Sequence, residues 1–351
     1  MFIGIGGPEL DAAALELLGD IKPGGVCLFA RNIRDAGQTR KLLDDIRAVL
    51  PFEPFLSLDQ EGGTVDRLRR VLAPMPAAAK MRNADDASTL GNIIGEAISI
   101  LGFNTDFAPV VDVIDHQRSS VSNGLHNRAF GLSADDVIRF TTAFLEELRR
   151  WNILPCLKHF PGLGAATSDS HEELPEVGID DDELFRVDLA PYRALCSKAG
   201  RGFVMSAHAA FPFSKLQETD QRGKLIPSSL SRNFVTGLLR NELGSESIAV
   251  TDDLEMGAIL RNFGIGTAAV MAVNAGEDML AVCAGAENIR EVRDTVVSAV
   301  EQGRIASRRV DDAVERIEAA RHGLKPPASF DEARLKYITA EIAAFTKDLD
   351  G

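Results

Sequence analysis

The sequence predicts an α/β fold in which eight parallel strands close into a single (β/α)8 barrel of the TIM type. Short apolar runs alternate with segments of helical periodicity along most of its 351 residues. The runs are continuous rather than alternating, as in CLF, FLSL, FAPVV, ILPCL and FVMS, which is typical of strands buried on both faces of a parallel sheet. Eight strand-then-helix units favour a closed barrel.

The eight expected strands are Phe2–Ile5, Gly25–Ala30, Phe55–Leu58, Thr105–Val111, Ile153–Leu157, Gly202–Met205, Ser247–Val250 and Met279–Val282. Helices are expected between most of them, for example at Leu10–Leu18, Thr39–Leu50, Ala87–Leu101, Ala134–Arg150, Asp181–Ala199 and Ser229–Leu243. An open doubly wound sheet is the alternative. No Gly-x-Gly-x-x-Gly opens a helix after any of these strands, so the main signal for dinucleotide binding is missing.

The chain after the last strand is expected to be helical. Ala286–Gln302 and Ala306–Gly323 have helical periodicity, Lys325-Pro326-Pro327 marks a hinge, and a polar helix follows from Phe330 towards Leu349. We expect these helices to pack outside the barrel. The predicted organisation is a barrel unit over residues 1–323 with a C-terminal helical extension over 324–351.

Composition limits the kinds of molecule that the protein is expected to bind. The formal net charge of −14 and the isoelectric point near 5.0 argue against nucleic acid or an anionic membrane, because phosphate binding requires a basic face. No run approaches the roughly 20 apolar residues of a membrane-spanning helix. The first residues have no secretory pattern, and the four separated cysteines are expected to be buried, reduced thiols. We therefore expect a cytoplasmic protein that binds small molecules, with no cofactor.

Polar residues follow six of the eight expected strands, where barrel enzymes place their catalytic groups. They are Arg31-Asn32, Asp59-Gln60-Glu61, Asp112, Lys158-His159, Ser206 with His208, and Asp252-Asp253. This pattern predicts an active site at the carboxyl ends of the strands.

The stretch from Leu157 to Pro175 holds several side chains that could take part in catalysis. It carries Lys158, His159, Asp169 and His171 around Pro and Gly residues. Loops of this length usually bind or cover something, although a plain surface excursion is the alternative. An Asp two positions before a His can orient and charge the imidazole.

Three further positions are candidates for binding or catalysis. Asp252 is a candidate nucleophile or charge stabiliser, while Asp253 could instead cap the following helix. Asp59 could accept two sugar hydroxyls, with Arg67 holding either the carboxylate or the ligand. Arg128 is a second candidate anchor.

Six motifs together resemble the glycoside hydrolase family 3 β-N-acetylglucosaminidases: KHFPGLG, SDSH, DQEGG, NRAFG, FAPVVDV and TDDLEM. The resemblance covers most of the chain. It implies a cytoplasmic enzyme that removes non-reducing terminal N-acetylglucosamine from muropeptides during cell-wall recycling. It also implies a retaining mechanism in which Asp252 forms a covalent glycosyl-enzyme and His171, paired with Asp169, is the acid/base. The first sugar subsite would contain Asp59, Arg67, Arg128, Lys158 and His159.

These implied roles agree with the chemistry of the side chains. A His with an ordinary pKa of about 6.5 can donate to a leaving oxygen and then deprotonate water near neutral pH, while a carboxylate stays ionised as the nucleophile. Asp169 would stabilise the imidazolium and fix its orientation.

Departures from the family pattern bear on specificity. Leu163 stands where the family has His, Thr64 where it has Arg, and Asn127 where it has Asp. A β-glucosidase or a broad hexosaminidase is therefore the main alternative, and an oxazoline route through the substrate acetamide is a second mechanism for N-acetyl sugars. More distant alternatives are a metal-dependent hydrolase with His159, His171, His208 and Asp252 as ligands, and a non-catalytic sugar-binding barrel.

Overall fold

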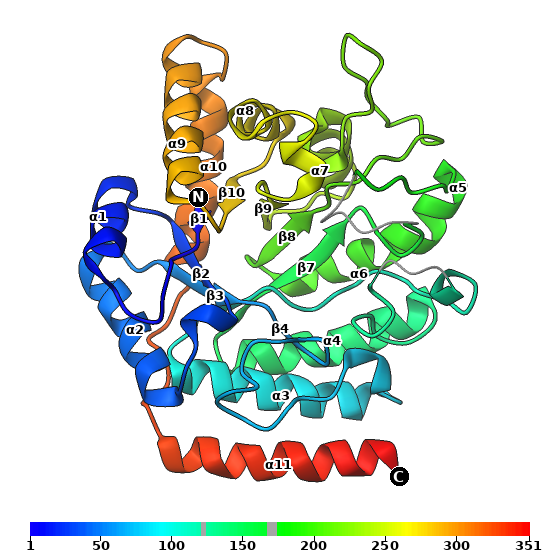
Figure 1. The fold of residues 1–351 in the computed structure, drawn as a ribbon. Helices are drawn as coiled ribbons and strands as arrows, with labels where there is room; N and C mark the ends of the chain where they lie inside the picture. The colour runs from blue at the N-terminus through cyan, green and yellow to red at the C-terminus, as the bar shows by residue number, and fades with distance from the viewer. Residues whose placement is uncertain (121–123, 167–173) are drawn as a thin grey trace.

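A computed structural model describes residues 1–120, 124–166 and 174–351. Eight strands form a closed barrel in the order β1-β10-β9-β8-β7-β6-β3-β2, and every neighbouring pair is parallel (Figure 1). The predicted (β/α)8 fold is confirmed. The strands are β1 (Phe2–Ile3), β2 (Gly25–Leu28), β3 (Phe55–Leu58), β6 (Thr105–Asp106), β7 (Leu154–Phe160), β8 (Phe203–Ser206), β9 (Ile248–Asp253) and β10 (Met279–Val282).

The helices occupy the segments between and after the strands. The α-helices are α1 (Ala12–Ile21), α2 (Ala36–Val49), α3 (Ala84–Leu101), α4 (Ala134–Arg150), α5 (Asp181–Glu183), α6 (Leu189–Ala199), α7 (Gly257–Leu260), α8 (Ile265–Ala275), α9 (Ala286–Glu301), α10 (Ser307–Arg321) and α11 (Glu332–Asp350). Short 3-10 turns are η1 (Ala30–Asn32), η2 (Ala78–Lys80), η3 (Arg118–Ser120) and η5 (Ser228–Leu230), and wider π-helical segments are η4 (Leu184–Asp188) and η6 (Asn233–Glu242).

Local side chains explain where several helices begin. The carboxylate of Asp11 accepts from Ala14 N at the start of α1, and Asp35 accepts from Gln38 N at the start of α2. Asn83 and Ser133 do the same for α3 and α4. Such caps satisfy amide groups that have no partner within the helix.

The expected helix over Asp181–Ala199 is divided into α5, η4 and α6. Leu189 N bonds to Leu184 O across a wide turn, and this turn holds Asp188, whose buried carboxylate accepts two hydrogen bonds from Arg118. The sequence periodicity does not reveal this wider turn, because its cause is a contact with a distant segment.

Regular pairing of the fourth barrel strand is shorter than predicted. We expected a strand over Thr105–Val111, but β6 ends at Asp106. Pro109 has no N–H to donate to a ladder. The chain then returns to β7 through Val111, whose N–H donates to Lys158 O at 2.8 Å. This return places Asp112 beside the end of β7.

A small hairpin that was not predicted follows β3. It pairs β4 (Gln60–Gly62) with β5 (Val65–Asp66) in antiparallel fashion. Gly62 and Gly63 have φ of 87° and 59°, and a Cβ on Gly62 would lie 2.3 Å from Pro76 O, so only glycine fits this turn. The hairpin carries Glu61 and leads into Arg67.

Aromatic rings fill the interior of the barrel. Phe2 packs edge-to-face against Phe107 with ring centroids 5.0 Å apart, and Phe55 against Phe203 at 5.1 Å. All four rings are buried. The barrel is therefore a packed core.

The C-terminal helices pack outside the barrel, as predicted. Figure 1 shows α11 lying along α3 at the edge of the molecule. Ile338 and Ile342 of α11 are buried, and Arg334 forms two hydrogen bonds of 2.6 Å with Glu96 of α3. The division into a barrel unit and an extension at residue 324 stays a prediction.

Two predictions made from composition, one about the cysteines and one about membrane-spanning helices, can be compared with the structure. All four cysteines are free and buried, as expected for reduced thiols. Among the described residues, no helix combines the length and the apolar character that crossing a membrane requires.

Candidate active site

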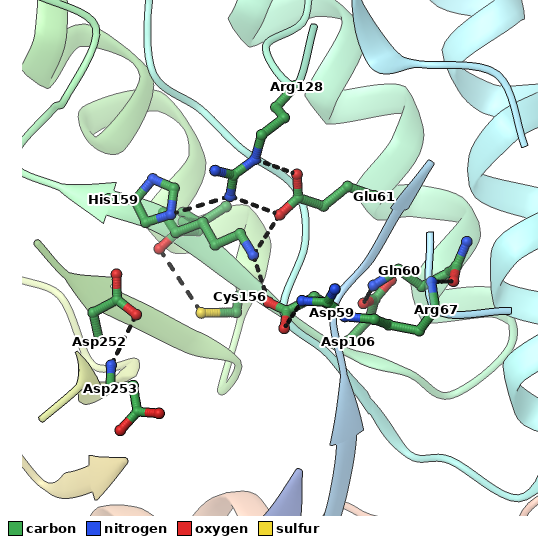
Figure 2. Close-up of polar contacts among 12 residues, drawn as sticks. Asp59, Gln60, Glu61, Arg67, Asp106, Arg128, Cys156, His159, Asp252 and Asp253 are labelled. Carbon is green, nitrogen blue, oxygen red and sulfur yellow. Dashed lines mark hydrogen bonds and ion pairs between the residues drawn. The ribbon is translucent and has the colours of Figure 1, made fainter. Parts of the chain in front are cut away.

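A cavity of about 450 Å³ lies at the carboxyl ends of the barrel strands. It brings together six of the eight predicted site residues: Asp59, Arg67, Arg128, Lys158, His159 and Asp252. Figure 2 shows Asp252 and Asp253 on one side and the Asp59, Glu61, Arg67 and Arg128 group on the other. The other two predicted residues, Asp169 and His171, lie outside the described residues.

Lys158 is the central cation of the site. It projects from β7, its side chain is only 2 % exposed, and its Nζ lies 2.8 Å from Asp59 Oδ1 and 2.6 Å from Glu61 Oε1. Burial alone would lower the pKa of Lys158, but the two carboxylates raise it above its ordinary value. Lys158 therefore stays charged in the interior of the barrel.

The two carboxylates around Lys158 stay ionised for the complementary reason. Burial alone would raise the pKa of Asp59, but Lys158 and Arg67 hold that pKa well below its usual range. For Glu61, Lys158 and Arg128 likewise outweigh burial and lower the pKa. The result is a network of alternating charges with fixed geometry.

Two arginines complete this network. Arg67 Nη2 donates to Asp59 Oδ2 at 3.3 Å, and the backbone N–H of Arg67 donates to Gln60 Oε1 at 3.0 Å. Arg128 forms a bidentate pair with Glu61, with distances of 2.8 and 3.0 Å (Figure 2). The β4–β5 hairpin thus positions both arginines. The side chain of Gln60 holds the backbone of Arg67, and Glu61 holds the guanidinium of Arg128.

His159 follows Lys158 on β7 and is held by Asp112. The ring Nδ1 lies 2.8 Å from Asp112 Oδ2, and the backbone N–H of His159 donates to the same oxygen at 3.3 Å. On the other side of the ring, His159 Nε2 lies 3.5 Å from Arg128 Nη2. The ring is therefore fixed between an acceptor and a donor.

A third buried carboxyl group, Asp106, lies at the end of β6. Burial raises the pKa of Asp106 well above its usual range. Its Oδ1 accepts from Gln60 N at 2.9 Å, while its Oδ2 has no hydrogen-bond partner in the described part of the chain. Asp106 thus supports the start of the hairpin.

The opposite side of the cavity carries two consecutive carboxylates from the end of β9. Asp252 lines the cavity, and its Oδ1 accepts from Asp253 N at 2.8 Å. Asp253 Oδ1 accepts from Glu255 N at 3.0 Å, which closes the following turn. Burial raises the pKa of Asp253 to about 7, so a large part of Asp253 is protonated near neutral pH.

His208, proposed as a metal ligand in one alternative, has both ring nitrogens engaged. Its Nδ1 lies 2.7 Å from Ser229 Oγ, and its Nε2 lies 3.1 Å from Asp253 O. Burial lowers the pKa of His208. Across the described ranges, no three His, Cys, Asp or Glu residues are grouped so that they could hold a metal ion.

Sequence reasoning missed the roles of Glu61 and Asp112. Both stand after predicted strands, in DQEGG and FAPVVDV, so their positions were visible. Their partners, Arg128 and His159, lie 67 and 47 residues further along the chain. Pairing of neighbouring strands, such as β6 with β7, brings their loops together.

Charged groups at the carboxyl ends of the barrel strands are typical of (β/α)8 enzymes, and this protein has that arrangement. Residues 6–320 match the glycosyl hydrolase family 3 N-terminal domain. The chain therefore belongs to glycosyl hydrolase family 3, which confirms the predicted family.

Curated relatives of this chain are β-hexosaminidases. The chain is 32 % identical over 287 residues to β-hexosaminidase of Pseudomonas aeruginosa, with 81 % of this chain and 82 % of that protein covered. It is also 32 % identical over 289 residues to β-hexosaminidase A of Pseudoalteromonas piscicida, covering 78 % of this chain but only 47 % of that longer protein. The chain thus spans about half the length of this second relative.

A solved structure supports the same family. The family 3 β-N-acetylglucosaminidase from Paenibacillus sp. str. FPU-7 is 31 % identical, with a TM-score of 0.86, and the match covers 98 % of this chain and 66 % of that one. NagZ from Neisseria gonorrhoeae, at 24 % identity and a TM-score of 0.79, matches 100 % of this chain and 98 % of its own and shows the shared fold.

Proposed function

We propose that the protein is a retaining β-N-acetylglucosaminidase that removes non-reducing terminal N-acetylglucosamine from cell-wall-derived muropeptides. The observation that carries this proposal is the position of Asp252. Its carboxylate lines the cavity apart from a group of paired cations and carboxylates. In retaining glycosidases a carboxylate of this kind attacks the anomeric carbon of the bound sugar. The β-hexosaminidase relatives support the choice of sugar.

The sugar would be bound by Asp59, Arg67, Arg128, Lys158 and His159. These side chains line one cavity and hold each other through ion pairs and hydrogen bonds. Because the geometry is set before the substrate arrives, binding costs little side-chain entropy. The cations donate to sugar oxygens, and Asp59 accepts from hydroxyl groups.

In the proposed reaction, Asp252 attacks the anomeric carbon and forms a covalent glycosyl-enzyme. His171, oriented by Asp169, gives a proton to the leaving oxygen and then takes one from the attacking water. No metal or cofactor enters these steps. We place the reaction in the cytoplasm, in keeping with four free, buried thiols.

One observation favours a second candidate within the same chemistry. Leu163, which stands where the resemblance expects a His, is buried and lines the cavity. The side chain of Leu163 can form no hydrogen bond with a sugar in this cavity. A broad hexosaminidase or a β-glucosidase is therefore the alternative.

The two candidates are separated by hydrolysis of aryl β-N-acetylglucosaminide and aryl β-glucoside, followed by release of N-acetylglucosamine from a muropeptide. Each assay compares the wild type with Asp252→Ala and His171→Ala, with and without a chelator. We expect selective cleavage of the N-acetyl substrate that Asp252→Ala abolishes, that His171→Ala slows strongly and that the chelator leaves unchanged. Equal rates on both sugars would favour the broader enzyme. No cleavage of either sugar, or activity unaffected by Asp252→Ala, would overturn the proposal.

A further inference from the structure

The carboxylate of Asp112 is shared by three N–H groups from the end of β7. Its Oδ2 accepts from His159 Nδ1 and from the His159 backbone, and its Oδ1 accepts from Leu163 N at 2.6 Å. The side chain is fully buried and does not line the cavity. Asp112 can therefore influence a bound ligand only through the groups that it holds.

The two neighbours of His159 require the same arrangement of its ring proton. The Asp112 carboxylate is only an acceptor, so Nδ1 must carry the hydrogen. Arg128 has only donors, and its Nη2 lies on the Nε2 side of the ring. An N–H at Nε2 would face the N–H groups of Arg128, so two donors would meet without an acceptor. Both contacts therefore select the neutral ring with its proton on Nδ1.

We propose that Asp112 is a positioning residue that keeps His159 in this Nδ1–H form, so that the Nε2 lone pair accepts a hydrogen bond from a substrate hydroxyl. The inference rests on the proposed sugar-binding role of His159. It gives the cavity an uncharged acceptor beside the Arg128 donor. A hydroxyl next to both groups can donate to Nε2 in place of the long 3.5 Å contact with Arg128 Nη2, and accept from the guanidinium, which fixes its orientation.

An Asn at position 112 cannot accept from all three N–H groups. If its carboxamide oxygen faces Leu163 N–H, its NH2 group faces His159 Nδ1, and the ring proton must move to Nε2. If the oxygen faces His159, the NH2 group faces the Leu163 N–H instead. Either way a buried donor loses its acceptor, which costs about 1–3 kcal/mol, or roughly 5- to 150-fold in an equilibrium.

The first test is spectroscopic and uses the wild-type protein. Histidine is labelled with 15N, and the His159 signals are identified by their absence in His159→Gln. We expect the directly bonded hydrogen on Nδ1 and a lone-pair-type Nε2. A hydrogen on Nε2, or on both nitrogens, would overturn the inference. This reading requires neither activity nor a folded variant at position 112.

The second test is kinetic and compares Asp112→Asn with Asp115→Asn. Asp115 is a matched control, because its carboxylate accepts from Gln117 N and Arg118 N and has no contact with His159. We expect Asp112→Asn to lower kcat/KM on the aryl N-acetylglucosaminide by about tenfold or more. Asp115→Asn should leave kcat/KM within about twofold of the wild type, as expected for a turn that keeps an acceptor oxygen.

A double variant separates positioning from general destabilisation. If Asp112 acts through His159, Asp112→Asn should lower kcat/KM no further in a His159→Gln background. If the two substitutions lower kcat/KM by independent factors that multiply in the double variant, the inference is contradicted. An Asp112→Asn enzyme with the kcat/KM of Asp115→Asn would contradict it too. Failure of the wild type to cleave either aryl glycoside would overturn the proposed function, whereas the ring-proton measurement would still decide the role of Asp112.

Discussion

The ammonium group of Lys158 lies 2.8 Å from Asp59 Oδ1 and 2.6 Å from Glu61 Oε1, so one buried cation separates two carboxylates that would otherwise repel each other. Arg67 pairs with Asp59, and Arg128 pairs with Glu61. The proposed sugar-binding wall is therefore one electrostatic unit, and a change at any member should be felt by the others.

Removing the cation should destabilise the protein most near neutral pH. The pKa values of Asp59 and Glu61 are lowered in the folded protein, so these groups contribute stability above their unfolded pKa values of about 4, which is lost as the pH falls through the lower folded values. Lys158→Met should raise both folded pKa values and lower the free energy of unfolding near pH 7 by about 3–5 kcal/mol, and this difference from the wild type should shrink as the pH falls towards 3. Urea unfolding measured between pH 3 and 7 checks this.

The control is Lys80→Met, which breaks an exposed pair with Asp350. It should change the free energy of unfolding by less than about 1 kcal/mol. Equal free energies of unfolding of Lys158→Met and Lys80→Met at pH 7 would show that the buried network does not depend on its central cation.

Glu61→Gln should weaken substrate binding by releasing Arg128. Gln keeps the shape of Glu61 but loses the negative charge that holds Arg128 at 2.8 and 3.0 Å and Lys158 at 2.6 Å. We expect kcat/KM to fall about tenfold or more, corresponding to the loss of about 1.4 kcal/mol of transition-state stabilisation. Steady-state kinetics provide the measurement. Glu147→Gln, a change at a buried Glu on α4 outside the site, is the control and should keep kcat/KM close to the wild-type value.

Glu277 should make the folded protein less stable as the pH rises. Burial raises its pKa to about 8, whereas the unfolded value is about 4.3. The folded protein therefore binds a proton more tightly than the unfolded chain between these values, and its free energy of unfolding falls by up to about 1.4 kcal/mol per pH unit across that window. Glu277→Gln removes this dependence, so it should match the wild type near pH 4 and exceed it at pH 8.

The pH dependence of Glu277→Gln can be checked by chemical unfolding at both pH values. Glu315→Gln, at an exposed position of α10, should follow the wild type throughout. A stability difference between Glu277→Gln and wild type that stays constant from pH 4 to 8 would contradict the assignment.

The final helix should contribute to stability through its buried face. Ile338 is fully buried, while its neighbour Tyr337 is 62 % exposed. Ile338→Ala should lower the free energy of unfolding by about 2–5 kcal/mol, whereas Tyr337→Ala should cost less than about 1 kcal/mol. If both variants are equally stable in urea, α11 contributes little, and residues 324–351 form a dispensable extension.

The fold was predictable because its strands are short and buried on both faces. Runs such as FLSL coincide with β3 to the residue, and the helix over Ala134–Arg150 agrees with α4 at both ends. The β4–β5 hairpin was not predicted, because Gly62-Gly63 indicates a turn without showing which residues pair across it.

The site was predictable as a set of positions but not as a set of contacts. Strand ends identified Asp59, Lys158, His159 and Asp252, which line one cavity. The partners that set charge and ring orientation, Glu61 and Asp112, are revealed only by contacts between distant segments. The roles of Asp169 and His171 stay predictions.

The proposed reaction requires Asp252 to become covalently bound to the sugar. The most direct test is to trap the intermediate with a fluorinated N-acetylglucosaminyl donor that is cleaved slowly, and to identify the modified peptide by mass spectrometry. We expect one sugar attached to Asp252 and none in Asp252→Ala. Turnover with no adduct would indicate an oxazoline route through the acetamide, and an adduct on another residue would contradict the assignment of the nucleophile.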